Sequence, residues 1–196
     1  MSPDRIRERY ERIQGEAGPG VTIVAATKYV SLADMAALAE AGIQVVGENR
    51  AQDLERKHSQ YGDAFRWHFI GRLQSNKVKV VNRICELVHS LESESAARKL
   101  TVPALVEVNL SGEASKGGVD PEELPHLLGL ADVRGLMTMP PAAEDPEESR
   151  PYFRRLRELA EQHGLRELSM GTSQDWRIAV EEGATLIRVG SVLYAD

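Results

Sequence analysis

Apolar residues occur along this chain in eight short runs, and segments with a helical spacing of apolar residues separate them. Short apolar runs bounded by turn residues are typical of buried strands, whereas apolar residues three and four positions apart indicate helices. The predicted strands span residues 21–26, 43–46, 66–70, 86–91, 103–109, 133–137, 166–170 and 185–190. The predicted helices span residues 3–14, 31–41, 50–58, 74–84, 93–100, 120–130, 147–163 and 174–182.

The order of these elements predicts the fold. Strand and helix alternate eight times, which favours parallel strands joined by right-handed crossovers. Eight such units close a (β/α)8 barrel, although about 250 residues is more usual for this fold. We therefore expect an α/β protein with a single TIM-type barrel domain over residues 1–196 and an extra N-terminal helix. A doubly wound open sheet is the alternative fold.

Local signals support the predicted helix boundaries. Ser31 precedes the segment LADM, and Asp34 follows three residues later, a pattern similar to a capping box at a helix start. Gly42, Gly164 and Gly183 each follow a helical segment, where a residue in the left-handed conformation commonly ends a helix. These signals do not depend on the apolar spacing, so they strengthen the assignment of helices.

Composition narrows the classes of partner. The chain has 42% hydrophobic and 28% charged residues, as in an ordinary globular protein, and a net charge of −6. It has no basic run, so we expect no nucleic-acid partner. The single Cys85 excludes an intramolecular disulfide. Without a signal-peptide core or an apolar stretch of membrane-spanning length, we expect a soluble cytoplasmic protein with no membrane partner. We also expect a monomer.

A barrel of this kind places its functional residues at the carboxyl ends of its strands. Those ends carry mostly Gly, Ser, Thr and Asn here, with two cations and few carboxylates. The absence of a carboxylate pair argues against glycoside hydrolysis. The five histidines lack metal-binding spacing, which argues against zinc.

Lys28 directly follows the first predicted strand, and on a strand period it shares a face with Thr22, Val24 and Ala26. If that face lines the barrel, the amine lies on the axis above the small Ala26. A desolvated lysine loses its proton more easily, as a Schiff-base lysine requires. The alternative is a lysine that marks the strand's exit into water.

Two turns near the C-terminus combine glycine with a hydroxyl. Gly171 and Ser173 precede the last predicted helix, and Gly190 and Ser191 follow the last predicted strand. Barrels commonly bind phosphate at the loops after strands seven and eight, through backbone N–H groups and a helix N-terminus. Capping and tight turning are the alternative roles. Together with a reactive lysine on strand one, the turns describe an aldehyde with a phosphate arm, which is pyridoxal 5′-phosphate.

Arg188 shares a strand face with Leu186 and Gly190, so its guanidinium is expected to point into the barrel. A buried arginine needs a partner. One interpretation is a salt bridge to an acidic neighbour such as Glu107. The other is a donor aimed at the pyridine nitrogen of the cofactor, where a permanent cation would keep that nitrogen unprotonated and weaken the ring as an electron sink.

Seven segments in order resemble the YggS/PROSC family, the pyridoxal phosphate homeostasis proteins. They are ATK at 26–28, GEN at 47–49, WHFIGRLQSNK at 67–77, VNLSGEASKGG at 108–118, GLMTM at 135–139, LSMGTSQD at 168–175 and IRVGS at 187–191. The resemblance runs from about residue 20 to residue 191 and implies a barrel like the N-terminal domain of alanine racemase. The residues it assigns to pyridoxal phosphate are Lys28, Asn49, His68, Ser173, Arg188, Gly190 and Ser191.

The resemblance also implies roles for these residues. Lys28 would hold the cofactor as an internal aldimine. Ser173 and the turn at 190–191 would hold the phosphate, and Arg188 would face the pyridine nitrogen. Asn49 and His68 would lie around the ring. Lys116 is a second lysine that the family pattern places near the mouth of the barrel.

The function implied by the resemblance is cofactor homeostasis or delivery to apo-enzymes that depend on pyridoxal phosphate, without substrate turnover. Racemisation needs two opposed bases, and an additional domain supplies the second in alanine racemase. This chain ends at Asp196, and Tyr194 near a fraying end makes a poor preorganised base. An amino-acid racemase is the alternative function, and a cofactor-free Schiff-base aldolase is a third.

Overall fold

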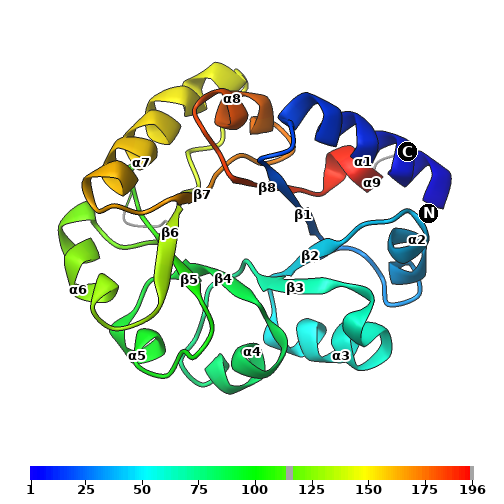
Figure 1. The fold of residues 1–196 in the computed structure, drawn as a ribbon, viewed down its shortest axis with the longest axis horizontal. Coiled ribbons are helices and arrows are strands. Elements are labelled where there is room, and N and C mark those ends of the chain that lie inside the picture. Colours follow the sequence, from blue (N-terminus) through cyan, green and yellow to red (C-terminus); the bar gives the residue numbers. More distant parts are fainter. Residues whose placement is uncertain (114–116, 195–196) are drawn as a thin grey trace.

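Eight parallel strands close into a barrel in the computed structural model, which describes residues 1–113 and 117–194 (Figure 1). Each strand pairs with the next along the chain, and β8 pairs with β1, so the predicted TIM-type barrel is confirmed and the open sheet is wrong. The strands are β1 (Thr22–Ala26), β2 (Val45–Glu48), β3 (Arg66–Phe69), β4 (Leu87–Leu91), β5 (Ala104–Glu107), β6 (Val133–Met137), β7 (Glu167–Ser169) and β8 (Leu186–Val189). All eight coincide with predicted strands to within two residues at each end.

The helices surround the barrel (Figure 1). They are α1 (Pro3–Ala17), α2 (Met35–Glu40), α3 (Ala51–Tyr61), α4 (Val78–Ile84), α5 (Glu94–Ala97), α6 (Leu124–Leu128), α7 (Arg150–Gln162), α8 (Trp176–Glu181) and α9 (Ser191–Tyr194). Three short 3-10 helices complete the described elements: η1 (Gly62–Ala64), η2 (Pro121–Glu123) and η3 (Pro146–Ser149). The predicted N-terminal helix is confirmed as α1, and it lies beside α9, which the apolar pattern did not predict.

Two apolar clusters hold the fold together. The larger lies between the barrel and its helices, where side chains such as Phe153 and Trp176 are at most 2% exposed. The smaller fills the inside of the barrel and consists of Val24, Val45, Leu87, Leu105, Met137 and Leu186, with Ile70 packed against it. Because side chains alternate along a strand, one strand serves both clusters. The inside of this barrel is therefore a packed core.

The predicted start of the second helix is wrong by four residues. Ser31 Oγ accepts the backbone N–H of Asp34 at 3.1 Å and donates to the Asp34 carboxylate at 2.5 Å. This contact closes a turn ahead of α2, which begins only at Met35. Short polar side chains compete in this way with helical hydrogen bonds. The three predicted helix-ending glycines are confirmed, with φ of +84° at Gly42, +68° at Gly164 and +94° at Gly183.

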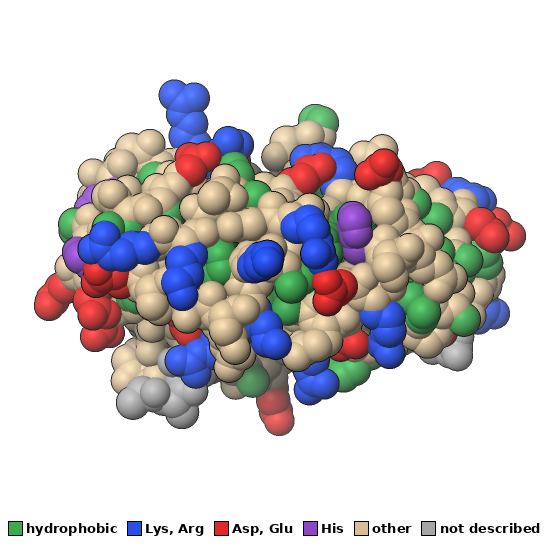
Figure 2. All heavy atoms as spheres, turned by 90° about the horizontal axis from the view of Figure 1, so that it is seen from below, with side chains coloured by type: hydrophobic (Ala, Val, Ile, Leu, Met, Phe, Trp, Pro, Cys, Tyr) green, Lys and Arg blue, Asp and Glu red, His purple; other side chains and the backbone are tan. Residues whose placement is uncertain are grey.

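The side of the molecule in Figure 2 carries many Lys and Arg side chains. Acidic, apolar and neutral surface lies between them, so the view shows no unbroken basic face. In residues 1–113 and 117–194, no helix combines the length and apolar character that crossing a membrane requires.

Candidate functional site

Ser173 lies between β7 and α8 at the carboxyl end of the barrel. Its hydroxyl oxygen accepts hydrogen bonds from the backbone N–H groups of Gly190, in the turn after β8, at 3.0 Å and of Val192, in α9, at 3.4 Å. The two glycine-plus-hydroxyl turns that the sequence singled out therefore meet in space. The N–H groups of Gly190 and Val192 point to the Ser173 hydroxyl, at the loops where barrels commonly bind phosphate.

The backbone of the β7–α8 loop depends on a glycine. Gly171 has φ of +89°, and a Cβ atom there would lie 2.5 Å from Ala179 Cβ and 2.9 Å from Trp176 Cα. Only glycine adopts this conformation and also leaves room for α8. Asp175 closes the loop, because its carboxylate accepts from the backbone N–H and the hydroxyl of Thr172, at 2.7 and 3.0 Å.

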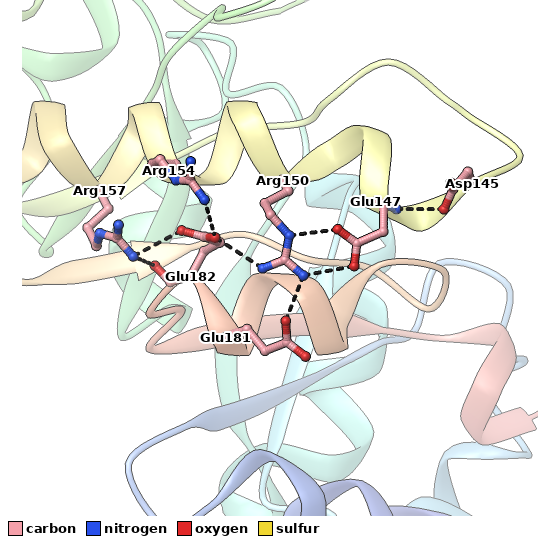
Figure 3. Close-up of polar contacts among 7 residues, drawn as sticks. All are labelled: Asp145, Glu147, Arg150, Arg154, Arg157, Glu181 and Glu182. Atoms are coloured by element: carbon pink, nitrogen blue, oxygen red, sulfur yellow. Dashed lines mark hydrogen bonds and ion pairs between the residues drawn. The ribbon is translucent and has the colours of Figure 1, made fainter.

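An ion-pair network fixes α8 against α7 (Figure 3). Glu182, after the end of α8, accepts from Arg150 at 3.1 Å, from Arg154 at 3.2 Å and from Arg157 at 3.0 Å. Arg150 also contacts Glu181 at 2.7 Å. Because α8 continues directly from the loop that holds Ser173, the network also restricts where that loop can lie.

Arg188 points into the barrel, as predicted, and is 6% exposed. It donates through Nη1 to Ser169 Oγ, and through Nη2 to the carbonyl oxygen of Thr138 at 3.1 Å and to Met139 Sδ at 2.9 Å. No ion pair joins it to Glu107 among the residues described, so the predicted alternative of a salt bridge to that residue is wrong.

The electrostatics of Arg188 reflect burial. Burial lowers the pKa of Arg188 to about 10, against the opposing effects of Glu107 and Asp175. The guanidinium therefore stays charged at neutral pH. Burial also raises the pKa of Glu107, Glu92 raises it further, and Arg188 and Arg72 lower it.

Small residues line the mouth beside Arg188. Gly190 follows β8, and a Cβ atom there would lie 3.4 Å from the carbonyl oxygen and 3.6 Å from the Cβ of Ala26. Ala26 in turn pairs with Gly47 on β2. A Cβ atom on Gly47 would lie only 2.9 Å from side-chain atoms of Val24 and Ile70, so the close packing at this position requires a glycine.

Lys28 does not occupy the place predicted for it. The inward row is correct as far as Val24, but β1 ends at Ala26 and a turn follows, closed by the Val30 N–H to the Thr27 carbonyl at 2.9 Å. Lys28 lies in this turn, exposed, with Nζ 4.6 Å from the centre of the Tyr29 ring. The predicted desolvation of its amine on the barrel axis is therefore wrong in this structure.

A buried ion pair holds the turn that carries Lys28. Glu48 and Lys57 are 0% and 1% exposed and form an ion pair. Lys57 also donates to the carbonyl oxygen of Thr27 at 2.7 Å, and the Thr27 hydroxyl donates to Glu48 at 2.6 Å. The exposed Lys28 therefore directly follows a residue, Thr27, that the buried ion pair of Glu48 and Lys57 holds in place.

Asn49 lies next to this ion pair. Its side-chain Oδ1 is buried and has no hydrogen-bond partner, which is uncommon and unfavourable for a buried polar atom. Its backbone is closely packed, since a Cβ on Gly71 would lie 2.2 Å from the Asn49 carbonyl oxygen. An unsatisfied oxygen held in a rigid backbone is suited to accept a hydrogen bond from a ligand.

His68 lies inside the barrel, 3% exposed, with Ile70 on the same face nearer the mouth. Its Nδ1 lies 2.9 Å from His89 Nε2. The structure joins it to Arg188 through other side chains and does not bring it to the rim. His68 is therefore buried, and its contact with a cofactor ring stays a prediction.

Two further predicted positions remain. Ser191 begins α9 and is exposed. Lys116 lies outside the described residues. Tyr194 has a buried hydroxyl without a partner, and burial, with a smaller contribution from Glu48, raises its pKa well above the ordinary value.

Sequence reasoning missed three parts of this region: the pairing of Glu48 with Lys57, the role of Ser169, and the contact of Arg188 with Thr138 and Met139. Lys57 lies in the predicted helix over residues 50–58, and no role was predicted for it. The available signal was the run VVGE, which places a carboxylate at the end of an apolar strand where it needs a cationic partner.

The site lies at one end of a closed eight-stranded parallel barrel, with a glycine-plus-hydroxyl turn after β8 and an inward arginine on β8. Comparisons with known proteins show the family to which this barrel belongs. The family model described as the alanine racemase N-terminal domain matches residues 1–196, and this chain belongs to that family. Two relatives named pyridoxal phosphate homeostasis protein are each 40% identical to it. The one from Aquifex aeolicus aligns over 98% of this chain and 95% of its own length, and the one from Deinococcus radiodurans over 97% and 96%.

Solved structures show the same fold. PipY of Synechococcus elongatus PCC7942, crystallised with PLP bound, is 34% identical, with a TM-score of 0.85 over 97% of this chain and 100% of that one. Alanine racemase from Corynebacterium glutamicum is 15% identical, with a TM-score of 0.76 over 99% of this chain and 61% of that one. The second comparison shows a shared fold alone.

Proposed function

We propose that this protein binds pyridoxal 5′-phosphate and acts in intracellular cofactor homeostasis, holding the cofactor and releasing it to apo-enzymes without substrate turnover. The observation that carries the proposal is the convergence of Ser173, the backbone of Gly190 and the guanidinium of Arg188 at one end of the barrel. The names of the relatives and the PLP-bound structure of PipY support it.

The residues present fit the cofactor. The N–H groups of Gly190 and Val192, which donate to Ser173 in this structure, would hold the phosphate. The Ser173 hydroxyl and the turn at Ser191 would complete this phosphate site. Arg188 would donate to the pyridine nitrogen. Asn49 offers a buried oxygen without a partner on the opposite side of the mouth. When bound, pyridoxal phosphate supplies an aldehyde that reacts reversibly with a primary amine, and Lys28 would provide that amine.

The exposure of Lys28 suits a protein that exchanges its cofactor. Enzymes that use a lysine for covalent chemistry commonly desolvate it to make it a better nucleophile. Here the amine is open to solvent, so an acceptor can approach it without opening the fold. Reversible holding needs this access more than it needs a fast reaction.

Arg188 is the reason that we propose no substrate turnover. A cation beside the pyridine nitrogen opposes its protonation and so weakens the ring as an acceptor of electrons. The pKa of Arg188, about 10, leaves the guanidinium charged over the physiological range. We expect no α-proton exchange of amino acids in deuterated water. Exchange at a steady catalytic rate would favour the racemase alternative.

Reductive trapping tests the proposal. The protein incubated with pyridoxal phosphate should show the visible absorption of a lysine adduct, and borohydride should fix one label on the peptide that contains Lys28. Lys28→Ala should abolish stoichiometric labelling, whereas Lys79→Ala, which removes an exposed lysine on α4, should not. Full labelling of the Lys28→Ala protein with unchanged affinity would contradict the assignment.

A further inference from the structure

Four polar side chains form a continuous buried chain through the inside of the barrel. Arg188 Nη1 donates to Ser169 Oγ, which lies 2.7 Å from His89 Nδ1, and His89 Nε2 lies 2.9 Å from His68 Nδ1. Ser169 and His89 are fully buried, and His68 is 3% exposed. The four residues come from β8, β7, β4 and β3, so the chain crosses the barrel.

The guanidinium fixes the direction of every hydrogen bond in this chain. Arginine is a donor without an acceptor atom, so Ser169 must accept from it. Among the described residues the Ser169 hydroxyl contacts only Arg188 and His89 Nδ1, so its own proton goes to His89 Nδ1. A buried hydroxyl proton left without an acceptor would be costly.

The two histidine tautomers follow. With Nδ1 accepting from Ser169, a neutral His89 carries its proton on Nε2 and donates it to His68 Nδ1. His68 then carries its proton on Nε2. Both rings are neutral at pH 7, because burial lowers the pKa of His68 to about 4 and that of His89 well below its ordinary value.

At His68 the hydrogen-bond chain reaches a cavity at the other end of the barrel. A cavity of about 350 Å³ lies at the amino ends of the strands, and His68 lines it together with Thr22, Arg66, Glu86, Arg134 and Glu167. Since Nδ1 of His68 is used by His89, Nε2 is the nitrogen left to face this cavity. Water there can accept its proton, so the whole chain is satisfied from the mouth of the barrel to its opposite end.

We propose that Ser169, His89 and His68 are positioning residues for Arg188, acting through hydrogen bonds that run in one direction from the guanidinium to the cavity at the amino ends of the strands. The hydrogen-bond chain holds Arg188 through Nη1, and Thr138 and Met139 hold it through Nη2, so Nε–H and the second Nη1 N–H are the donors left for a ligand. This inference rests on the proposed function in one respect, namely that Arg188 faces the pyridine nitrogen. The direction of the chain does not depend on a cofactor.

The first test uses the cofactor-free protein. Nitrogen-15 NMR of labelled histidine distinguishes the two neutral tautomers, and we expect both His68 and His89 to carry the proton on Nε2 at neutral pH. Ser169→Thr keeps the hydroxyl and should preserve this result. A proton on Nδ1 of His89 would overturn the proposed direction.

The second test separates positioning from mere packing. Pyridoxal phosphate is compared with its 1-deaza analogue, in which a C–H group replaces the ring nitrogen. The wild-type protein should prefer the natural cofactor, and Ser169→Ala should reduce the ratio of the two affinities by about tenfold or more, as expected for losing a hydrogen bond to a charged donor. Ser169→Thr should restore the ratio.

The outcomes are distinguishable. Equal weakening of both ligands in Ser169→Ala would overturn the positioning role, because packing defects do not discriminate at the ring nitrogen. A wild-type protein that binds neither ligand would overturn the proposed function and, with it, the link to the pyridine nitrogen. The tautomer measurement on the cofactor-free protein would still decide the direction of the chain.

Discussion

The two sides of the barrel mouth are built differently. On the β7–β8 side, Arg188 is 6% exposed and has three hydrogen-bond acceptors, and Ser173 accepts two backbone N–H groups. On the β1–β2 side, Lys28 is exposed and Asn49 Oδ1 lacks a partner. Under the proposed function, the first side would hold the phosphate and the ring in an arrangement that is already fixed. The second side would present the Lys28 amine above the buried Glu48–Lys57 ion pair, so the proposed function separates the groups that recognise the cofactor from the amine that reacts with it.

The largest expected effect on stability comes from the buried Glu48–Lys57 ion pair that holds the turn carrying Lys28. Lys57→Met leaves the Glu48 carboxylate buried without its cation, and losing one partner of a buried pair costs about 3–5 kcal/mol in the free energy of unfolding. Urea unfolding measures this loss. The matched control is Lys57→Met combined with Glu48→Gln, which removes both charges and should recover most of the stability. A single variant that loses under 1 kcal/mol would show that the β1–β2 side does not depend on this ion pair.

The next effect concerns the polar chain below the β7–β8 side. The pKa of His68 is lowered to about 4 in the folded protein from 6.5, so the folded state favours the neutral ring. That contribution is complete above pH 6.5 and is lost as pH falls through 4. The 2.5-unit difference corresponds to about 3 kcal/mol. Urea unfolding between pH 7 and 4 measures it, and His68→Gln should make the profile less steep over this range, whereas the contribution of His89 remains. An unchanged profile would mean that the ring is not buried neutral.

The fold was predictable because its signal is local. Apolar runs such as 21–26 and 185–190 follow from neighbouring residues, and so does the inward direction of Arg188, two positions after the apolar Leu186. Strand period failed at Lys28, because pairing stops at Ala26 and the turn redirects the side chain. The two-residue period of a strand predicts which side a residue faces, and it does not predict the residue at which strand pairing ends.

The hydrogen-bond chain could not be predicted for another reason. His68, His89, Ser169 and Arg188 meet only through the pairing of strands that are far apart in the sequence, and the neighbours of each residue do not fix that pairing. The available signal was the presence of His and Ser inside apolar strands, since a buried polar side chain needs a partner. The signal tells that partners exist and not which residues they are.

Two glycines sharpen the comparison within the β7–β8 side. Gly171→Ala forces a Cβ atom to within 2.5 Å of Ala179 Cβ at φ of +89°, so we expect a loss of about 2–3 kcal/mol in unfolding free energy. Gly190→Ala meets only ordinary contacts of 3.4 and 3.6 Å with Ala26, so its stability should change by less than about 0.5 kcal/mol. Its methyl group enters the mouth, however, and should weaken cofactor binding. Equal stability of the two variants would contradict the loop geometry.

The smallest effect tests what Ser173 contributes. Its hydroxyl oxygen accepts from Gly190 and Val192 N–H groups, and a bound phosphate would compete for the same donors while gaining the hydroxyl proton. Ser173→Ala therefore removes one hydrogen bond to a charged group and should weaken pyridoxal phosphate binding by about 1–2 kcal/mol. Ser173→Thr keeps the hydroxyl and serves as the control. Pyridoxal without phosphate should bind wild-type and Ser173→Ala proteins with the same low affinity in a fluorescence titration. If Ser173→Ala weakened pyridoxal as strongly as pyridoxal phosphate, Ser173 would be shaping the loop and not binding the phosphate, and the β7–β8 side would lose its assigned role in recognition.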